Sequence, residues 1–182
     1  MIEEAIEVLK KGGIMLYPTD TIWGIGADAT NEDACQKVIE LKNRTSDKSF
    51  IILVDSIRML ERYVPEFPEV CYELIDYSVK PLTIIYPCSK GLASNVLALD
   101  GSVGIRVVKD TLCCQLIRGL KRPIVSTSAN FTNDPSPIDY ANISEGIRNG
   151  VDFSFPSSKS GLNEPSQIIK IGLDNSVQVI RN

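Results

Sequence analysis

Apolar residues follow two alternating patterns along this chain. Segments with a helical spacing of apolar positions alternate with short, nearly continuous apolar runs that are typical of buried strands. The helical spacing predicts helices at 3–11, 31–42, 56–62, 68–78, 111–120 and 143–148. The apolar runs predict strands at 14–17, 50–54, 82–86, 102–108, 124–126, 167–171 and 177–180. Residues 18–29, with breakers at Pro18, Gly24 and Gly26, and residues 131–138 are predicted to be loops. This alternation predicts an α/β fold.

The length and composition set the class of protein. A chain of 182 residues fits one domain spanning 1–182, and 43% hydrophobic with 23% charged residues is ordinary for a globular protein. No apolar run reaches the roughly 18 residues that a membrane span needs. The acidic start lacks the basic and apolar regions of a signal peptide. We therefore expect a cytoplasmic protein with no membrane partner.

The most restrictive number is the histidine count, which is zero. It excludes histidine-assisted serine or cysteine catalysis, histidine general bases and histidine metal ligands. The five cysteines include no CxxC spacing, so we expect mostly buried, reduced thiols and no metal site. A net charge of −4 excludes a uniformly basic nucleic-acid-binding surface but allows a local basic cluster.

A polar run directly follows the first predicted strand. Thr19, Asp20 and Thr21 supply two hydroxyls and a carboxylate, and the glycines after them would let the backbone approach a ligand. A capped turn, with Trp23 in the core, explains the same residues, so both interpretations stay open. No GxxxxGK[ST] motif occurs, which excludes a P-loop.

Three cations lie within seven positions at the end of a predicted helix: Lys42, Arg44 and Lys48. An arginine fork beside lysine point charges would suit a triphosphate. Cations near a helix C-terminus also interact favourably with its dipole. Taken alone, a solvated face is therefore the favoured interpretation of this cluster.

An arginine lies in the middle of the apolar strand predicted at 102–108. Alternation along a strand places Ser102, Gly104 and Arg106 on one face. A buried arginine needs an anionic partner. That partner is either a ligand or a protein carboxylate, such as Asp20 or Asp28.

Three hydroxyls and an amide follow another buried strand, from Ser126 to Asn130. They could form a local side-chain turn, but hydrogen bonding to a ligand is the more natural role in a protein without histidine. Ser136 and Ser166 each follow a proline. Arg181 is a lone late cation that would by default face solvent.

Together these segments resemble the YrdC-type threonylcarbamoyl-AMP synthase family. The matching motifs are Y-P-T-D-T-x-x-G-I-G from Tyr17, K-x-R…K from Lys42, G-x-R from Gly104, S-x-S-A-N from Ser126, and Ser166 before the late strands. The resemblance covers essentially the whole chain. It implies a twisted, open, mixed sheet with flanking helices and a concave basic cavity, in the short form without an extra C-terminal domain.

The resemblance also implies a reaction. Members of the family join L-threonine, bicarbonate and ATP into threonylcarbamoyl-adenylate and diphosphate. A downstream threonylcarbamoyl transferase then uses that product to modify adenosine in tRNA, and direct contact with tRNA is left open. Mg²⁺ would be carried mainly by ATP oxygens and water, so no protein ligand cluster is required.

Site residues are carried over position by position. The resemblance implies catalytic charge neutralisation at Lys42, Arg44 and Lys48. It implies threonine contacts at Thr21, Arg106, Ser126 and Ser166, with Arg106 taking the carboxylate. It implies ATP contacts at Arg44, Lys48, Ser102, Ser128, Asn130, Ser136 and Arg181.

The chain departs from the family pattern at several positions. Thr45 and Ser49 replace frequent prolines, Leu53 stands where some relatives have histidine, and Gln167 replaces a frequent threonine. These departures bear on affinity and loop geometry and not on the reaction class. Two other functions are considered beside the implied one. One is a related enzyme that forms a carbamoyl-adenylate from a different carbamoyl donor. The other is an RNA-binding module, against which the negative net charge counts.

Overall fold

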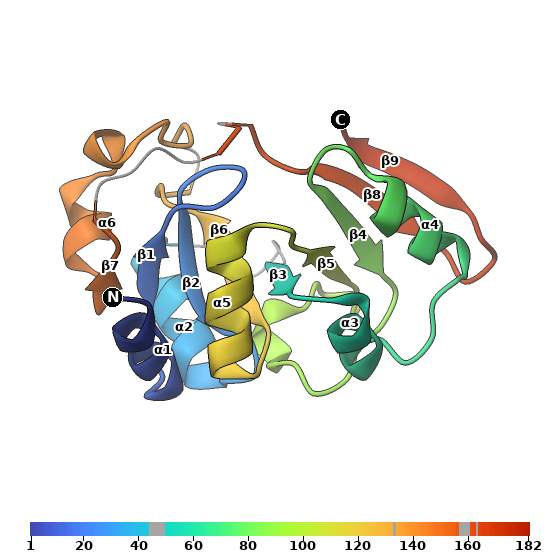
Figure 1. Cartoon of the computed structure of the whole chain (residues 1–182), viewed down its shortest axis with the longest axis horizontal. Coiled ribbons are helices and arrows are strands. Elements are labelled where there is room, and N and C mark those ends of the chain that lie inside the picture. Colours follow the sequence, from blue (N-terminus) through green and yellow to red (C-terminus); the bar gives the residue numbers. More distant parts are fainter. Residues whose placement is uncertain (44–49, 133, 157–160, 163) are drawn as a thin grey trace.

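The computed structural model describes residues 1–43, 50–132, 134–156, 161–162 and 164–182. In these ranges nine strands form one mixed sheet in the order β7-β1-β2-β6-β3-β5-β4-β8-β9, with helices on both faces (Figure 1). The strands are β1 (Met15–Tyr17), β2 (Gly24–Asp28), β3 (Ile51–Val54), β4 (Leu82–Tyr86), β5 (Val103–Val107), β6 (Ile124–Ser128), β7 (Phe153–Ser154), β8 (Gln167–Ile171) and β9 (Val177–Arg181). The helices are α1 (Ile2–Lys10), α2 (Glu32–Leu41), α3 (Ile57–Tyr63), α4 (Val70–Tyr77), α5 (Thr111–Leu120) and α6 (Glu145–Asn149). The predicted α/β fold with a mixed sheet is confirmed.

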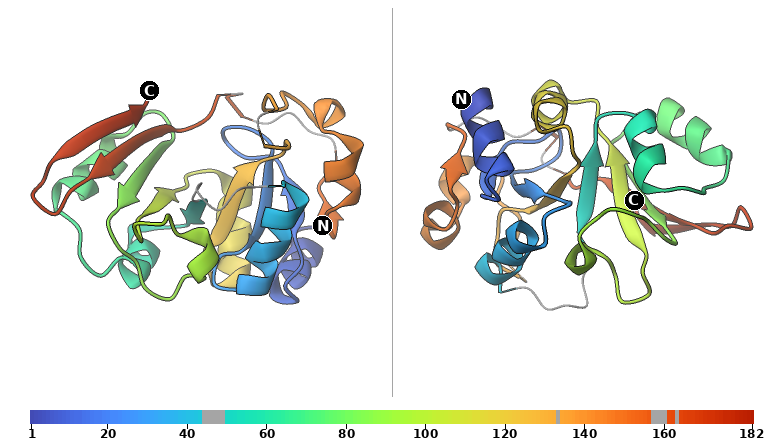
Figure 2. Two further views of the ribbon diagram at one scale, coloured as in Figure 1. Left: turned by 180° about the vertical axis from the view of Figure 1, so that it is seen from behind. Right: turned by 90° about the horizontal axis from the view of Figure 1, so that it is seen from below.

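The helices leave part of one sheet face available for a site. Helices α1 and α5 contact each other on one face of the sheet, and α2 lies on the opposite face (Figure 2). Helix α4 lies over the β4–β8 end, where Val70 and Leu74 border a groove with Ile169 of β8. The neighbouring residue, Ile168, points to the other face, because successive side chains of a strand alternate. That face of β8 borders the cavity described below.

Polar side chains begin the helices where the sequence predicted them. The side chain of Asn31 accepts a hydrogen bond from the backbone N–H of Ala34 at 3.1 Å. The Ser56 hydroxyl accepts one from the N–H of Met59 at 3.2 Å. Each satisfies a donor that the first helical turn leaves unpaired. The predicted start at Asn31 is confirmed, and of Asp55 and Ser56, which were both candidates to begin the next helix, the structure uses Ser56.

The prediction of a loop over 18–29 is wrong for its second half. Residues 24–28 form β2, which pairs antiparallel with both β1 and β6. A Cβ atom at Gly26 would lie only 2.8 Å from Cε1 of Tyr17 and 2.9 Å from Cε of Met15. Gly26 therefore makes room for side chains of the neighbouring strand, and the glycine that suggested a break belongs to the sheet.

Several other element boundaries differ from the prediction by one or two residues. Strand β6 continues to Ser128 instead of ending at Ser126, because its hydroxyl-bearing end still pairs with β2. The short β7 was not predicted, since only two residues form it, paired with β1.

The core follows the apolar pattern. Tyr17 and Trp23 are fully buried, and the thiols of Cys35, Cys71, Cys113 and Cys114 are buried while that of Cys88 is exposed. Burial raises the pKa of Cys35 to about 12 and that of Cys71 to about 11, which keeps both thiols protonated near neutrality. Within the described ranges, every helix is too short or too polar to cross a lipid bilayer.

Candidate functional site

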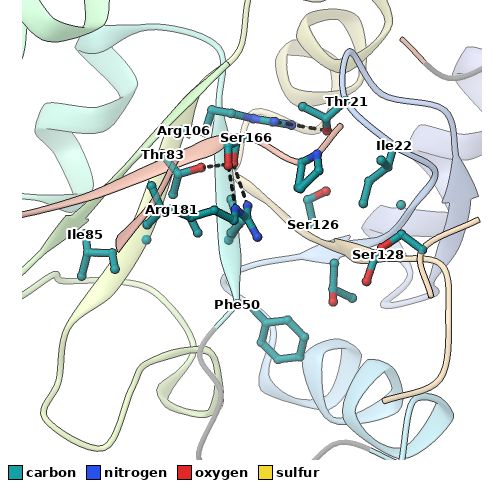
Figure 3. A pocket seen from close by; sticks show the side chains of 17 residues that line it. Thr21, Ile22, Phe50, Thr83, Ile85, Arg106, Ser126, Ser128, Ser166 and Arg181 are labelled. Carbon is teal, nitrogen blue, oxygen red and sulfur yellow. Dashed lines mark hydrogen bonds between the residues drawn. The ribbon is translucent and has the colours of Figure 1, made fainter. Parts of the chain in front are cut away.

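A cavity of about 330 Å³ lies on the sheet face opposite α4. Figure 3 shows the side chains that line it. Strands from both halves of the sheet reach it, so residues far apart in sequence share one hollow. Its described lining includes seven residues that carry hydroxyls, Thr21, Thr83, Ser126, Thr127, Ser128, Ser136 and Ser166, and two arginines, Arg106 and Arg181. The remaining lining is apolar or glycine: Ile22, Gly24, Phe50, Ile51, Ile85, Gly104, Pro165 and Ile168.

The cavity brings together most of the residues that the sequence singled out. All four expected threonine contacts line it: Thr21, Arg106, Ser126 and Ser166. Of the expected ATP contacts, Ser128, Ser136 and Arg181 line it. Lys42, Ser102 and Asn130 are absent from the described lining. Arg44 and Lys48 lie outside the described residues, as do Thr45 and Ser49.

Arg106 enters the cavity from the middle of β5. Its side chain is 4% exposed, and Nη2 lies 3.1 Å from Oδ1 of Asp20. The two atoms form an ion pair, but their geometry is not that of a hydrogen bond. Nη1 donates to Oγ1 of Thr21 at 3.3 Å, and no described group bonds Nε. Asp20 is therefore the protein partner of Arg106, whereas Asp28 pairs with Arg122 at 2.8 Å.

The charge of Asp20 is itself perturbed. Burial raises the pKa of Asp20, and the guanidinium of Arg106 acts in the opposite direction. Asp20 is absent from the described cavity lining, so it holds Arg106 from the side. The guanidinium edge that remains can accept an anion such as a carboxylate.

A second cluster joins β4, β8 and β9 at the other side of the cavity. The hydroxyl oxygens of Thr83 and Ser166 are 2.8 Å apart. Nε of Arg181 donates to the carbonyl of Ser166 at 2.9 Å, and Nη2 approaches the Ser166 hydroxyl at 3.4 Å. Arg181 thus lines the cavity and does not simply extend into solvent.

Thr83 is a site residue that the sequence analysis did not identify. It is 1% exposed and lies within an apolar strand, where a hydroxyl must find a partner. That single polar residue inside the run Leu82 to Tyr86 was the available signal. Its partner, Ser166, could not be found without the parallel pairing of β4 with β8.

The charged side chains of the described lining are two arginines, Arg106 and Arg181. Burial, and then the charge of Arg106, lower the pKa of Arg181. No aspartate or glutamate belongs to the described part of the lining. The cavity therefore offers cationic forks and hydroxyls, a combination that suits carboxylate and phosphate oxygens.

Lys42 and Asn130 hold the backbone beside the cavity. The ammonium group of Lys42, in a residue 2% exposed, donates to the backbone carbonyls of Ser128 and Asn130. Nδ2 of Asn130 donates to the carbonyl of Asp134 at 2.6 Å. These contacts hold the end of β6, where Ser128 lines the cavity, and the turn that follows it.

Ser102 has a different environment. Its hydroxyl donates to Oδ1 of Asp100 at 2.6 Å, just before β5 begins. Of the three residues expected on one face of that strand, Gly104 and Arg106 line the cavity and Ser102 does not.

Known proteins are similar to this chain in sequence and in fold. Residues 7–182 match the model of the Sua5/YciO/YrdC family, which bears the description telomere recombination. A protein of Hahella chejuensis named threonylcarbamoyl-AMP synthase is 32% identical over 169 residues, covering 92% of this chain and 91% of its own. One of the same name from Vibrio campbellii is 29% identical, covering 91% of each chain.

Solved structures of related proteins have a similar fold. Sua5 of P. abyssi in complex with L-threonine has a TM-score of 0.88 and 27% identity over 93% of this chain, and this chain spans only 50% of that one. E. coli YciO has a TM-score of 0.86 at 22% identity, covering all of this chain and 88% of its own, which supports the fold alone. With the family match extending over residues 7–182, this chain belongs to the Sua5/YciO/YrdC family.

Proposed function

We propose that this chain is a nucleotidyltransferase that forms threonylcarbamoyl-adenylate and diphosphate from L-threonine, bicarbonate and ATP. One observation carries the proposal: a single cavity joins Arg106 and Thr21 to Ser128, Ser136 and Arg181, with no carboxylate in its described lining. An amino acid and a nucleotide both bring anionic oxygens to such a hollow. The name shared by its relatives supports the same activity.

Threonine binds at the Arg106 side of the cavity. The guanidinium takes the α-carboxylate, because Asp20 and Thr21 occupy only part of its donors. Ser126 and Ser166 hydrogen-bond the rest of the amino acid. The bound threonine in the Sua5 structure of P. abyssi supports an amino-acid site in this fold.

ATP binds beside it, with its phosphates near Arg181, Ser128 and Ser136. Lys42 organises the backbone of Ser128 through its carbonyl. Arg44 and Lys48, outside the described residues, add phosphate contacts in this proposal. Mg²⁺ arrives with the ATP, held by phosphate oxygens and water. The described residues contain no group of three or more His, Cys, Asp or Glu side chains that could hold a metal ion.

The chemistry needs positioning more than acid–base groups. The amine of threonine and bicarbonate condense to a carbamate with loss of water. A carbamate oxygen then attacks the α-phosphorus of ATP, and diphosphate leaves with its bonding electron pair. Phosphoryl-type transfer depends mainly on alignment and charge neutralisation, which arginine, lysine and Mg²⁺ supply without histidine. The product then passes to a threonylcarbamoyl transferase that acts on tRNA.

Diphosphate release tests the proposal. The purified chain with ATP and Mg²⁺ should release diphosphate only when threonine and bicarbonate are both present, and mass spectrometry should detect threonylcarbamoyl-adenylate. Release that ignores both co-substrates would contradict the proposal. Release with carbamoyl phosphate instead would indicate the other carbamoyl-adenylate chemistry. Salt-dependent tRNA binding without any turnover would indicate an RNA-binding module.

A further inference from the structure

Thr19 touches the site without lining it. The residue is 5% exposed and lies between β1 and β2, two positions before Thr21. The described lining of the cavity includes Thr21 but not Thr19. The reaction proposed above makes no use of Thr19, yet its hydroxyl takes part in three hydrogen bonds.

These bonds occupy the whole capacity of the Thr19 hydroxyl, which has one proton and two lone pairs. Oγ1 donates its proton to the carbonyl of Ile22 at 2.7 Å. It accepts a hydrogen bond from the backbone N–H of Thr21 at 3.1 Å. The contact of 2.8 Å between the hydroxyls of Thr19 and Thr21 must then be donated by Thr21, because Thr19 has no second proton.

The proton of the Thr21 hydroxyl is thereby directed toward Thr19. Oγ1 of Thr21 also accepts from Nη1 of Arg106 at 3.3 Å. One lone pair is left, on a side chain that borders the cavity (Figure 3). Thr21 can therefore accept a hydrogen bond from a ligand, but it cannot donate one unless its bond to Thr19 breaks.

We propose that Thr19 is a positioning residue that holds Thr21 as a hydrogen-bond acceptor for the amino group of the substrate. The inference deepens the proposed function and rests on it, because threonine is the amino acid bound there. Arg106 offers only donors and suits the carboxylate, whereas Thr21 offers only an acceptor and suits the amine. Two adjoining groups of opposite polarity match the two ends of an α-amino acid.

A pair of ligands isolates this recognition. L-Threonine and 3-hydroxybutyrate both carry a carboxylate and a hydroxyl, but only threonine carries an amine. Ligand-detected NMR titration gives the dissociation constant of each for the wild type, Thr19→Val and Thr19→Ser. Thr19→Val should weaken threonine binding about tenfold and 3-hydroxybutyrate binding less than twofold, because only the amine uses the acceptor. Thr19→Ser keeps the hydroxyl and should restore the preference for threonine.

The comparison within each variant separates recognition from folding, since a loss of folded protein reduces the binding of both ligands alike. Equal weakening of both ligands by Thr19→Val would overturn the inference. The double variant Thr19→Val/Thr21→Val should prefer threonine no less than Thr21→Val alone, and a further loss would also overturn it.

The proposed function has a separate readout. Diphosphate release by the wild type depends on threonine, bicarbonate and ATP together, whereas the titrations use no ATP. Loss of amine discrimination in Thr19→Val, with no co-substrate-dependent release by the wild type, would uphold the inference and refute the reaction. Co-substrate-dependent diphosphate release by the wild type, with undiminished amine discrimination in Thr19→Val, would uphold the reaction and refute the inference.

Discussion

The guanidinium of Arg106 and the carboxylate of Asp20 form an ion pair of 3.1 Å at the wall of the cavity. The two side chains differ in burial, at 4% and 24% exposed. The more deeply buried charge is the one that faces the cavity. Among the described residues, Asp20 is the carboxylate that pairs with Arg106. The ion pair thereby orients the guanidinium donors that remain available to a ligand.

Removal of the Asp20 charge should destabilise the protein. We expect Asp20→Asn to lower the free energy of unfolding by about 2 kcal/mol, because it leaves Arg106 buried without a counter-charge. Urea denaturation at neutral pH measures the loss, and saturating threonine should recover part of it by supplying a carboxylate. Arg118→Gln is the control, since that side chain pairs with Asp55 while 66% exposed, and it should cost less. Equal stability of Asp20→Asn and the wild type would show that the pair does not hold Arg106.

The hydroxyl of Thr83 should matter for catalysis although it is remote in sequence from the other site residues. Thr83→Val keeps the shape of the side chain but removes the bond to Ser166. We expect kcat/KM for threonine to fall about tenfold, the effect of one lost hydrogen bond in a buried site. Thr83→Ser retains the hydroxyl and serves as the matched control. A fall of the same size in Thr83→Ser would assign the effect to packing.

Gly161 should not tolerate a side chain. A Cβ atom there would lie 2.1 Å from the backbone oxygen of Asp20, and the N–H of Gly161 donates to the carbonyl of Thr19 at 2.8 Å. Gly161→Ala must displace one backbone from the other, at a cost of about 2–3 kcal/mol in unfolding free energy. It should also weaken threonine binding, because the displaced loop carries Thr21.

Gly101→Ala provides the comparison for Gly161→Ala. Gly101 has a φ of +81° and open space around its Cβ position, so that variant reports backbone strain alone, about 1 kcal/mol. If Gly161→Ala costs no more than Gly101→Ala and binds threonine normally, the close approach at Asp20 does not constrain the site.

The Ser102 hydroxyl should control the titration of Asp100. The hydroxyl and the backbone N–H of Ser102, together with Lys170, lower the pKa of Asp100 to about 2. Because the folded pKa lies below the ordinary value of 3.8, the stabilisation is complete above that pH and is lost as the pH falls toward 2. Ser102→Ala should raise the pKa, which carboxyl-carbon NMR measures directly. An unchanged pKa of Asp100 in Ser102→Ala would contradict the contact between Ser102 and Asp100. The same variant also tests the ATP contact that the resemblance implies for Ser102, which a tenfold higher KM for ATP would support.

Local sequence patterns were enough to predict the fold class, most helices and strands, and the types of chemistry available. Apolar periodicity fixed these elements because each must bury one face, and the zero histidine count restricted the chemistry to arginine, lysine, carboxylates and hydroxyls. The motifs also identified Arg106, Thr21 and Ser166 as candidates. Local patterns suffice for properties that depend on neighbours along the chain.

Which polar groups meet depends on the three-dimensional packing of the strands. Thr83 bonds Ser166 across 83 positions, and Arg106 bonds Thr21 across 85, through a strand order that periodicity does not encode. Residues 24–28, expected in a loop, form β2 because Gly26 leaves room for side chains of the adjacent strand β1. Hydrogen bonds and ion pairs act over a few ångströms, so their partners are set by the packing of the sheet and cannot be inferred from spacing along the chain.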